Sequence, residues 1–257
     1  ISSAGDVNDD GWIDLMIGAP NHDPGGAVST GAVYLLYGPH TEDLELDRAD
    51  AQLLGENTAD YAGQRVEGAV DLNGDGFDDL IIAAWGNDTG GSAAGAVYLV
   101  NGPLYGDLVL RDADQILVGE NPGDHAGSAV VNAGDMDDDG YDDLFVGSPD
   151  HSSEGAGSGA AYLLNGPITT DISMAGADAK IVGSRVGDHL GSSVARVGDV
   201  NGDDFPDLAV GAYLEDSGGI NAGAVYLMMG PVSGTILVTD SDGGFIGQSE
   251  SDRAGWS

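Results

Sequence analysis

The sequence predicts an all-β fold, a β-propeller built of four-stranded antiparallel blades, because a strand-rich unit occurs four times. An acidic stretch recurs as GDVNDDGWIDL, VDLNGDGFDDL, GDMDDDGYDDL and GDVNGDDFPDL, and its first aspartates, Asp6, Asp71, Asp135 and Asp199, are 65, 64 and 64 residues apart. An apolar stretch, GAVYLLYGP in the first unit, recurs in step from Gly31, Gly95, Gly159 and Gly223. Residues 1–257 are therefore one array of four repeats.

The strands of a unit follow one another in a fixed order. In the second unit the acidic stretch runs into DLIIAAW at 79–85, and GAVYLVNG and QILVG follow at 95–102 and 115–119. Clusters of Gly, Asn, Asp and Pro separate these β-rich runs, and no stretch keeps the 3.6-residue apolar period of a helix. Four candidate strands in about 64 residues suit a propeller blade better than a solenoid rung, which is usually shorter.

Charge and composition exclude several classes of function. The chain has 44 acidic and 7 basic residues, and its net charge of −37 would repel nucleic acids and anionic membranes. An apolar content of 41% in short patterned runs indicates a folded chain. There is no cysteine, no apolar run long enough to span a membrane and no signal-peptide pattern. Because the first residue is Ile1, we expect a processed or excised product.

The acidic stretch carries the oxygen donors of a calcium-binding loop. Ca²⁺ takes roughly six to eight oxygens, which a tight loop supplies from side chains at positions 1, 3, 5 and 9 and a main-chain carbonyl at position 7. We therefore expect about four Ca²⁺ ions, in loops at residues 6–14, 71–79, 135–143 and 199–207. The predicted ligands are Asp6, Asn8, Asp10, Trp12 and Asp14; Asp71, Asn73, Asp75, Phe77 and Asp79; Asp135, Asp137, Asp139, Tyr141 and Asp143; and Asp199, Asn201, Asp203, Phe205 and Asp207.

Two other interpretations of the acidic loops are weaker. An EF-hand needs a glutamate at position 12 and a helix on each side, but position 12 is Ile17, Ile82, Val146 or Val210. Asp, Asn and Gly also form ordinary turns, which would explain one such loop but not four with the same donors. Carboxylates about 4 Å apart repel by about 4 kcal/mol at an effective dielectric constant near 20, so converging aspartates favour a bound cation.

The fourth loop differs from the others at position 6. This position is Gly11, Gly76 or Gly140 in the first three loops and Asp204 in the fourth. Position 6 needs a left-handed backbone, which costs aspartate about 1 kcal/mol relative to glycine. We therefore expect the fourth calcium site to be the weakest.

Taken together, these motifs resemble the FG-GAP repeats of the integrin α-subunit propeller and its bacterial relatives. The likeness rests on the DxNxDGxxDL loop, on the following Gly18-Ala19-Pro20 and on an upstream pair in which alanine or leucine replaces the Phe of FG, as in Ala62-Gly63. The resemblance implies calcium in the loop between the first two strands of a blade, and a partner on the opposite face. It also implies an extracellular or cell-surface location and a role in adhesion.

The number of blades in the complete propeller stays open at this stage. Integrin propellers have seven blades, whereas this chain has four units, and the C-terminal DRAGWS followed by the N-terminal ISSAGD would read as one more junction between units. A segment of a longer array, a closed four-bladed ring and two chains that complete an eight-bladed ring are all compatible with the sequence.

The expected function is binding rather than catalysis. No cysteine nucleophile, GxSxG, HExxH or phosphate-binding glycine loop occurs. A protein or carbohydrate ligand on the face opposite the calcium loops would meet Trp85 and Tyr213, which replace the Pro of GAP, and His22 and His151 in the following loops. The alternatives are a propeller-fold lyase or hydrolase, and a structural spacer within a large surface protein.

Overall fold

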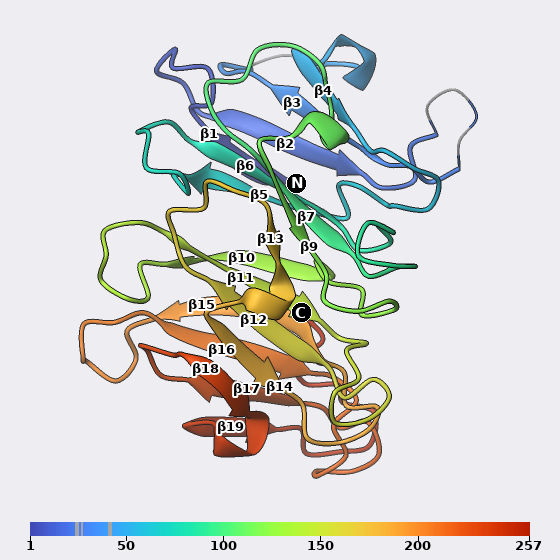
Figure 1. Cartoon of the computed structure of the whole chain (residues 1–257), viewed down its shortest axis with the longest axis vertical. Coiled ribbons are helices and arrows are strands. Elements are labelled where there is room, and N and C mark those ends of the chain that lie inside the picture. Colours follow the sequence, from blue (N-terminus) through green and yellow to red (C-terminus); the bar gives the residue numbers. More distant parts are fainter. Residues whose placement is uncertain (24–25, 27, 41–42) are drawn as a thin grey trace.

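The computed structural model describes residues 1–23, 26, 28–40 and 43–257, and its sheets confirm the all-β prediction (Figure 1). Each unit forms one antiparallel sheet, called a blade below. Blade 1 contains β1 (Ser2–Gly5), β2 (Asp14–Ala19), β3 (Ala32–Leu36) and β4 (Ala51–Leu54); blade 2 contains β5 (Arg65–Val70), β6 (Asp79–Ala84), β7 (Ala96–Val100) and β9 (Gln115–Val118); blade 3 contains β10 (Ala129–Gly134), β11 (Asp143–Ser148), β12 (Ala160–Leu164) and β14 (Ala179–Val182); and blade 4 contains β15 (Leu190–Gly198), β16 (Asp207–Ala212), β17 (Ala224–Met228) and β19 (Gly243–Ile246).

Three of the sheets have a fifth strand that the sequence did not predict. A short segment from the following unit pairs in parallel with the outer strand of the preceding blade: β8 (Leu108–Val109) with β4, β13 (Ile172–Ser173) with β9, and β18 (Gly234–Leu237) with β14. Each segment then enters a 3₁₀ turn. The blades are therefore linked by main-chain pairing as well as by side-chain packing.

The blades are apolar on both faces, and the core lies between them. In β6, Leu80 and Ile82 pack with residues of blade 1, whereas Ile81 and Ala83 pack with residues of blade 3. All six residues of β6 are buried, as are those of β11 and β16. Near-continuous apolar runs are typical of strands covered on both sides, which explains why DLIIAAW shows no alternation with polar residues.

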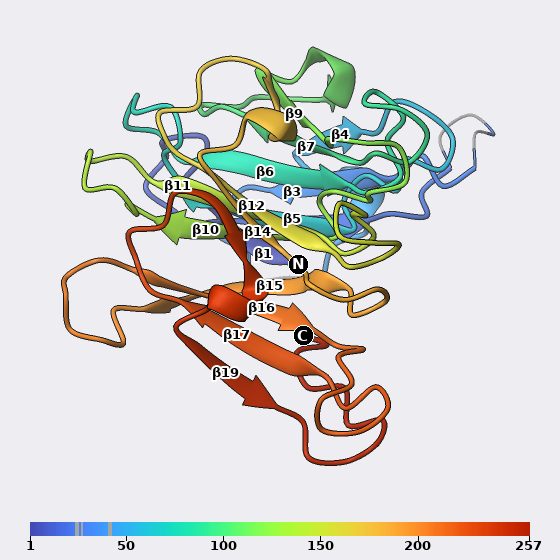
Figure 2. The same ribbon diagram turned by 60° about the horizontal axis from the view of Figure 1, so that its bottom comes forward.

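The four blades form an open array, so the closed four-bladed ring is not the arrangement of this chain. The first strands of blades 2 to 4, together with Ile1 before β1, line a cavity of about 420 Å³, to which Val66, Val130 and Val194 contribute. Blades 1 and 4 lie at opposite ends of the molecule (Figure 1). Their outward faces are uncovered: Leu15 is 36% exposed and Phe245 62%. Figure 2 shows blade 4 beyond the stack of the other three.

A glycine at the start of each third strand joins consecutive units. Gly95 forms a parallel bridge with Ala126, and its φ is +83°. A Cβ on Gly95 would lie 2.1 Å from the carbonyl oxygen of Ala126, so no other residue fits. Gly31, Gly159 and Gly223 make the same bridge, to Ala62, Leu190 and Ala254.

Candidate metal sites and the opposite face

The four acidic loops connect the first and second strands of the four blades, as expected. They project from one side of the array, on the left of Figure 1. Neighbouring loops also touch: Asp78 Oδ2 of the second loop accepts a hydrogen bond of 2.8 Å from the backbone N–H of Asp6 in the first. The structure thus gathers all the predicted ligands on one face of the molecule.

The carboxylate at position 1 organises each loop. In the first loop, the side chain of Asp6 accepts hydrogen bonds from the backbone N–H groups of Asp10 and Gly11 at 2.9 and 2.8 Å. Asp10 in turn accepts one from the N–H of Trp12 at 2.9 Å. Asp71, Asp135 and Asp199 hold their own loops in the same way. These carboxylates fold the chain around themselves, so hydrogen bonds from the backbone to the side chains at positions 1 and 5 hold each loop closed.

The aspartate at position 9 is buried in every loop: Asp14, Asp79, Asp143 and Asp207 have no exposed surface. Asp143 accepts hydrogen bonds from the N–H groups of Met136, at 2.7 Å, and Gly166, at 2.8 Å. Even so, burial, together with the nearby carboxylates of Asp137 and Asp139, raises the pKa of Asp143 to about 6. Burial also raises the pKa of Asp79 to about 6. A buried acid next to other acids is the environment that a bound cation stabilises.

The third loop has the most complete set of carboxylates. Oxygen atoms of Asp135, Asp137 and Asp143 all lie within 4.8 Å of one another, so these three residues could hold a metal ion. The other loops have an amide at position 3, and Asn8, Asn73 and Asn201 each donate a hydrogen bond from Nδ2 to the aspartate at position 5. Carboxylate, amide and carbonyl oxygens are the donors that Ca²⁺ prefers. The residues present therefore fit the ion that the sequence predicts.

The backbone at position 6 has the conformation that the sequence requires. Gly11, Gly76 and Gly140 have φ values of +89°, +90° and +94°, and Asp204 has +76°. The side chain of Asp204 is exposed. Asp204 therefore adopts the left-handed conformation, although it lacks the conformational freedom of glycine.

On the opposite face, Trp85 and Tyr213 lie half-buried between blades. The ring of Trp85 stacks on Tyr61, with centroids 4.7 Å apart, and meets the edge of His125 from the next unit at 4.9 Å. Tyr213 contacts His189 and Trp256 in a similar way. Trp85 also lines a hollow of about 350 Å³ with Gln64, His125, Ser128 and Asp150. These aromatic rings pack between neighbouring blades, and the part of the surface that they leave exposed borders a hollow.

Asp150, which the sequence analysis did not single out, lies between two histidines on this face. Its carboxylate is 2.5 Å from His125 Nδ1 and 3.0 Å from His189 Nδ1. Hydrogen bonds from the two imidazoles hold the pKa of Asp150 well below its usual range, and the same contact raises the pKa of His189. His125 and His189 occupy the same position in two repeats, and this was the signal in the sequence that could have pointed to the pair. Their common partner, Asp150, lies in the loop after β11, and nothing in the sequence connects it with this position.

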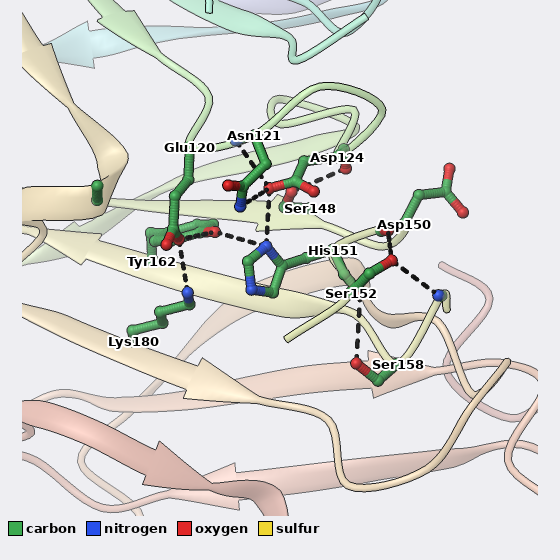
Figure 3. Close-up of polar contacts among 12 residues, drawn as sticks. Glu120, Asn121, Asp124, Ser148, Asp150, His151, Ser152, Ser158, Tyr162 and Lys180 are labelled. Atoms are coloured by element: carbon green, nitrogen blue, oxygen red, sulfur yellow. Dashed lines mark hydrogen bonds and ion pairs between the residues drawn. The ribbon is translucent and has the colours of Figure 1, made fainter. Parts of the chain in front are cut away.

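The expectation that His151 meets a ligand is wrong. His151 is 1% exposed, and its Nδ1 lies 2.7 Å from Asp124 Oδ2 and 3.3 Å from the Tyr162 hydroxyl (Figure 3). Tyr162 donates to Glu120, which also receives a hydrogen bond from Lys180. The histidine follows the fully buried strand β11, and these polar partners hold it within the blade. It serves the architecture of blade 3.

His22 takes the equivalent position in blade 1 and is half-buried. Its Nδ1 lies 3.3 Å from the hydroxyl of Tyr34. In blade 2 the position is Asn87, which donates to the hydroxyl of Tyr98 at 2.9 Å. This pattern assigns His22 a partner within its own blade.

Blade 4 places two acids together at this inner position. Glu215, the counterpart of His151, is 2% exposed, and Asp188, the counterpart of Asp124, is 7% exposed. Burial raises the pKa of Asp188 to about 6, and the charge of Glu215 adds to the shift. Arg185 forms an ion pair with Glu215 at 3.0 Å. Arg185 therefore pairs directly with Glu215 and not with Asp188.

Comparison with known proteins assigns the repeats. The model of the FG-GAP repeat matches residues 1–36, 62–100, 126–164 and 190–228. The chain is 30% identical over 228 residues to integrin alpha-5 of Xenopus laevis, covering 84% of this chain and 20% of that protein. It is 31% identical over 199 residues to integrin alpha-IIb of Homo sapiens, covering 74% and 18%. The chain thus spans about a fifth of the length of these relatives. Among the described residues, no helix is long and apolar enough to cross a membrane.

We expect Asp188→Asn to stabilise the protein at neutral pH. Because the folded-state pKa is raised, the folded chain binds the proton more tightly, so stability falls as pH rises from about 4 to about 6 and stays lower above that range. Removing the charge should raise the free energy of unfolding at pH 7.5 by about 1–2 kcal/mol and flatten its pH dependence between 4 and 6. Urea unfolding across pH measures both effects, with the exposed Asp240→Asn as control. A less stable Asp188→Asn protein at pH 7.5 would contradict this account.

Proposed function

Because the chain belongs to the FG-GAP repeat family, we propose that it is a calcium-binding propeller module that acts by binding and adhesion rather than catalysis. The observation that carries this proposal is the acidic face, where Asp135, Asp137 and Asp143 come within 4.8 Å of one another and three related loops present the same positions. An adhesive module works outside the cell, so we place the protein at the cell surface or among secreted proteins.

Each loop would hold one Ca²⁺ through the side chains at positions 1, 3, 5 and 9 and the main-chain carbonyl at position 7. That carbonyl belongs to Trp12, Phe77, Tyr141 or Phe205. Calcium suits these loops better than Mg²⁺, because the donors are many and protein-derived, whereas Mg²⁺ prefers strict octahedral geometry and keeps several waters. The ion would supply positive charge to the buried acid at position 9, which forms no ion pair with any residue that the structure describes.

The ions would also relieve repulsion across the whole molecule. Thirteen of the proposed ligands are aspartates, in a chain with a net charge of −37. Self-repulsion of this size opposes the compact state. Four Ca²⁺ ions would add eight positive charges, all on the face where carboxylates gather. We therefore propose that bound calcium stabilises the fold and that the acidic loops are its binding sites.

The ligand would bind on the opposite face. The hollow beside Trp85 combines an aromatic ring, the amide of Gln64, the hydroxyl of Ser128 and the carboxylate of Asp150. Such a mixture suits a protein side chain or a sugar, both of which offer an apolar patch and polar groups. Nucleic acid is disfavoured by the negative charge of the chain.

Calcium binding should stabilise the protein strongly. Calorimetric titration of the chelator-treated protein should give about four sites, and the thermal midpoint should rise with calcium because the ion binds only the folded state. Asp139→Asn should weaken one site, whereas its neighbour Asp138→Asn, outside the proposed ligand set, should leave all four. An unchanged midpoint with calcium or excess chelator would refute the proposal.

The fourth site should become stronger in Asp204→Gly. Glycine takes φ near +76° without the cost that aspartate meets, about 1 kcal/mol, which corresponds to roughly a five-fold change in the dissociation constant. The weakest step of the titration should tighten by this factor and the other steps should not change. A weakest step that is unaffected or weaker in Asp204→Gly would show that position 6 does not set the ranking.

The ligand face is tested with Trp85→Ala. We expect arrays of glycans and of extracellular-matrix proteins to show calcium-dependent spots whose signal falls roughly two- to ten-fold in this variant, as for loss of an aromatic contact. Asp138→Asn should retain the signal, and thermal melting should verify that Trp85→Ala is folded. Equal binding by Trp85→Ala would move the ligand away from this hollow.

A further inference from the structure

A lysine balances the acidic side chains beside the tyrosine of blade 3. The hydroxyl of Tyr162 donates a hydrogen bond of 2.9 Å to Glu120, and Lys180 Nζ lies 2.5 Å from the same carboxylate (Figure 3). Lys180 stands directly opposite Tyr162 in the pairing of β12 with β14. Burial opposes the charge of Glu120, yet hydrogen bonds from Lys180 and Tyr162 hold its pKa below the usual value. The ammonium group therefore offsets the burial of this acid.

Blade 4 also provides one basic residue for the two acids beside its tyrosine. Burial, together with the charges of Glu215 and Asp188, raises the pKa of Tyr226 to about 12, so both acids act on this tyrosine. Arg185 Nη1 lies 3.0 Å from Glu215 Oε1. The arginine comes from the loop before β15, whereas the lysine of blade 3 lies on the edge strand β14. The two blades thus place one positive charge at the same group of acids by different routes.

Blade 2 has two such acids, but an isoleucine stands at the position of the lysine. Tyr98 donates a hydrogen bond of 2.6 Å to Glu56 Oε1 and accepts one of 2.9 Å from Asn87 Nδ2. The same amide group lies 3.4 Å from Asp60 Oδ2. The residue opposite Tyr98 on the edge strand is Ile116. The structure describes all seven lysine and arginine residues of the chain, and among the described residues none forms an ion pair with Glu56 or Asp60.

One carboxylate oxygen of this group is buried without a partner. Asp60 is 1% exposed, and its Oδ2 accepts a hydrogen bond of 2.9 Å from the N–H of Asn57. Its Oδ1 is buried and receives no hydrogen bond from the part of the chain that the structure describes. Burial, together with the charge of Glu56, raises the pKa of Asp60. Because a buried anionic oxygen is costly unless a donor or a cation meets it, the group lacks one positive partner.

We propose that blade 2 binds a monovalent cation of the size of an ammonium ion, such as K⁺, at the carboxylates of Glu56 and Asp60. The ion takes the place that the ammonium group of Lys180 has in blade 3. Blades 3 and 4 each provide one lysine or arginine for two acids, so a single positive charge completes the same pattern in blade 2. Glu56 is partly exposed, which gives the ion a path from solvent.

The oxygen donors of this group favour a monovalent ion over Ca²⁺. Ca²⁺ takes about six to eight oxygen ligands. The hydroxyl of Tyr98 is already engaged with Glu56 and Asn87, and Asn87 Oδ1 accepts a hydrogen bond of 2.8 Å from the N–H of Thr89. The carboxylates of Glu56 and Asp60 are therefore the side chains of the group that offer oxygens to an ion. Two carboxylates suit a weakly held monovalent ion that keeps part of its water.

The stability of the whole chain in K⁺ tests the proposal. Urea unfolding is compared in KCl and in tetramethylammonium chloride of equal ionic strength, above neutral pH, so that both salts screen the net charge equally. Excess Ca²⁺ is present throughout; the acidic loop at 71–79 follows β5, whereas residues 55–64 precede it, so filled loops leave this site open. K⁺ at ten times its dissociation constant should raise the ratio of folded to unfolded protein about eleven-fold. Equal stability in the two salts overturns the proposal.

Substitutions in the group locate the ion. Ile116→Lys supplies the ammonium group that blade 3 has, so the response to K⁺ should vanish, whereas the uncharged Ile116→Met should keep it. Glu56→Gln removes a ligand charge and should also lose the response. Glu154→Gln makes the same change at an exposed position and should respond like the wild type. Circular dichroism verifies that each variant is folded. A full response in Ile116→Lys would place the ion elsewhere and overturn the proposal.

Anomalous scattering locates the ion independently of stability. Rb⁺ is close to K⁺ in size and scatters anomalously, so crystals grown in RbCl should show a peak beside the carboxylates of Glu56 and Asp60. Crystals of Ile116→Lys should show none there, because the lysine ammonium group takes the same place. A peak at this site with Ca²⁺ and not with Rb⁺ would assign a divalent ion and overturn the proposal.

Discussion

The structure depends on one constraint: each blade is apolar on both faces and must be covered on both. Leu80 and Ile82 point one way from β6 and Ile81 the other, so a single blade exposes half its apolar residues whichever face is packed. Burial of apolar surface is the main favourable term in folding. The blades therefore gain stability from one another, as in other repeat proteins. The added strands and the glycine bridges then fix how successive blades meet.

The acidic face uses the ends of the same sheets. Asp143 closes its loop by accepting from Met136 and Gly166, so its carboxylate belongs to the fold as much as to the candidate site. Backbone N–H groups shape the loop, but their hydrogen bonds do not offset the burial of Asp143 and the charges of the neighbouring carboxylates, since the pKa of Asp143 remains raised. The loops are thus formed by hydrogen bonds and remain electrostatically unfavourable. A bound cation would relieve this unfavourable electrostatic energy.

Sequence reasoning succeeded where a feature repeats and failed where a contact joins segments that are far apart in the sequence. The strand order, the acidic loops and the left-handed backbone of Asp204 could be predicted by aligning the four repeats, because equivalent residues of each repeat adopt the same local structure. The strand Leu108–Val109 was missed, because two apolar residues carry no periodicity and their partner lies about 55 residues earlier. Burial of His151 was missed for a similar reason: Asp124, which draws it inward, is 27 residues away in the sequence.

One buried polar position, just after the second strand of each blade, is occupied by chemically different residues in different blades. Asn87, His151 and Glu215 follow the second strand in successive blades, each near a tyrosine of the third strand and an aspartate from the start of the unit. The amide of Asn87 and the imidazole of His151 each offer an N–H to a neighbouring aspartate, Asp60 and Asp124 respectively. Glutamate brings a second negative charge, and Arg185 compensates it from outside the pair. The position therefore accepts an amide, an imidazole or a carboxylate, so the blade needs a polar partner for its buried neighbours here rather than one particular functional group.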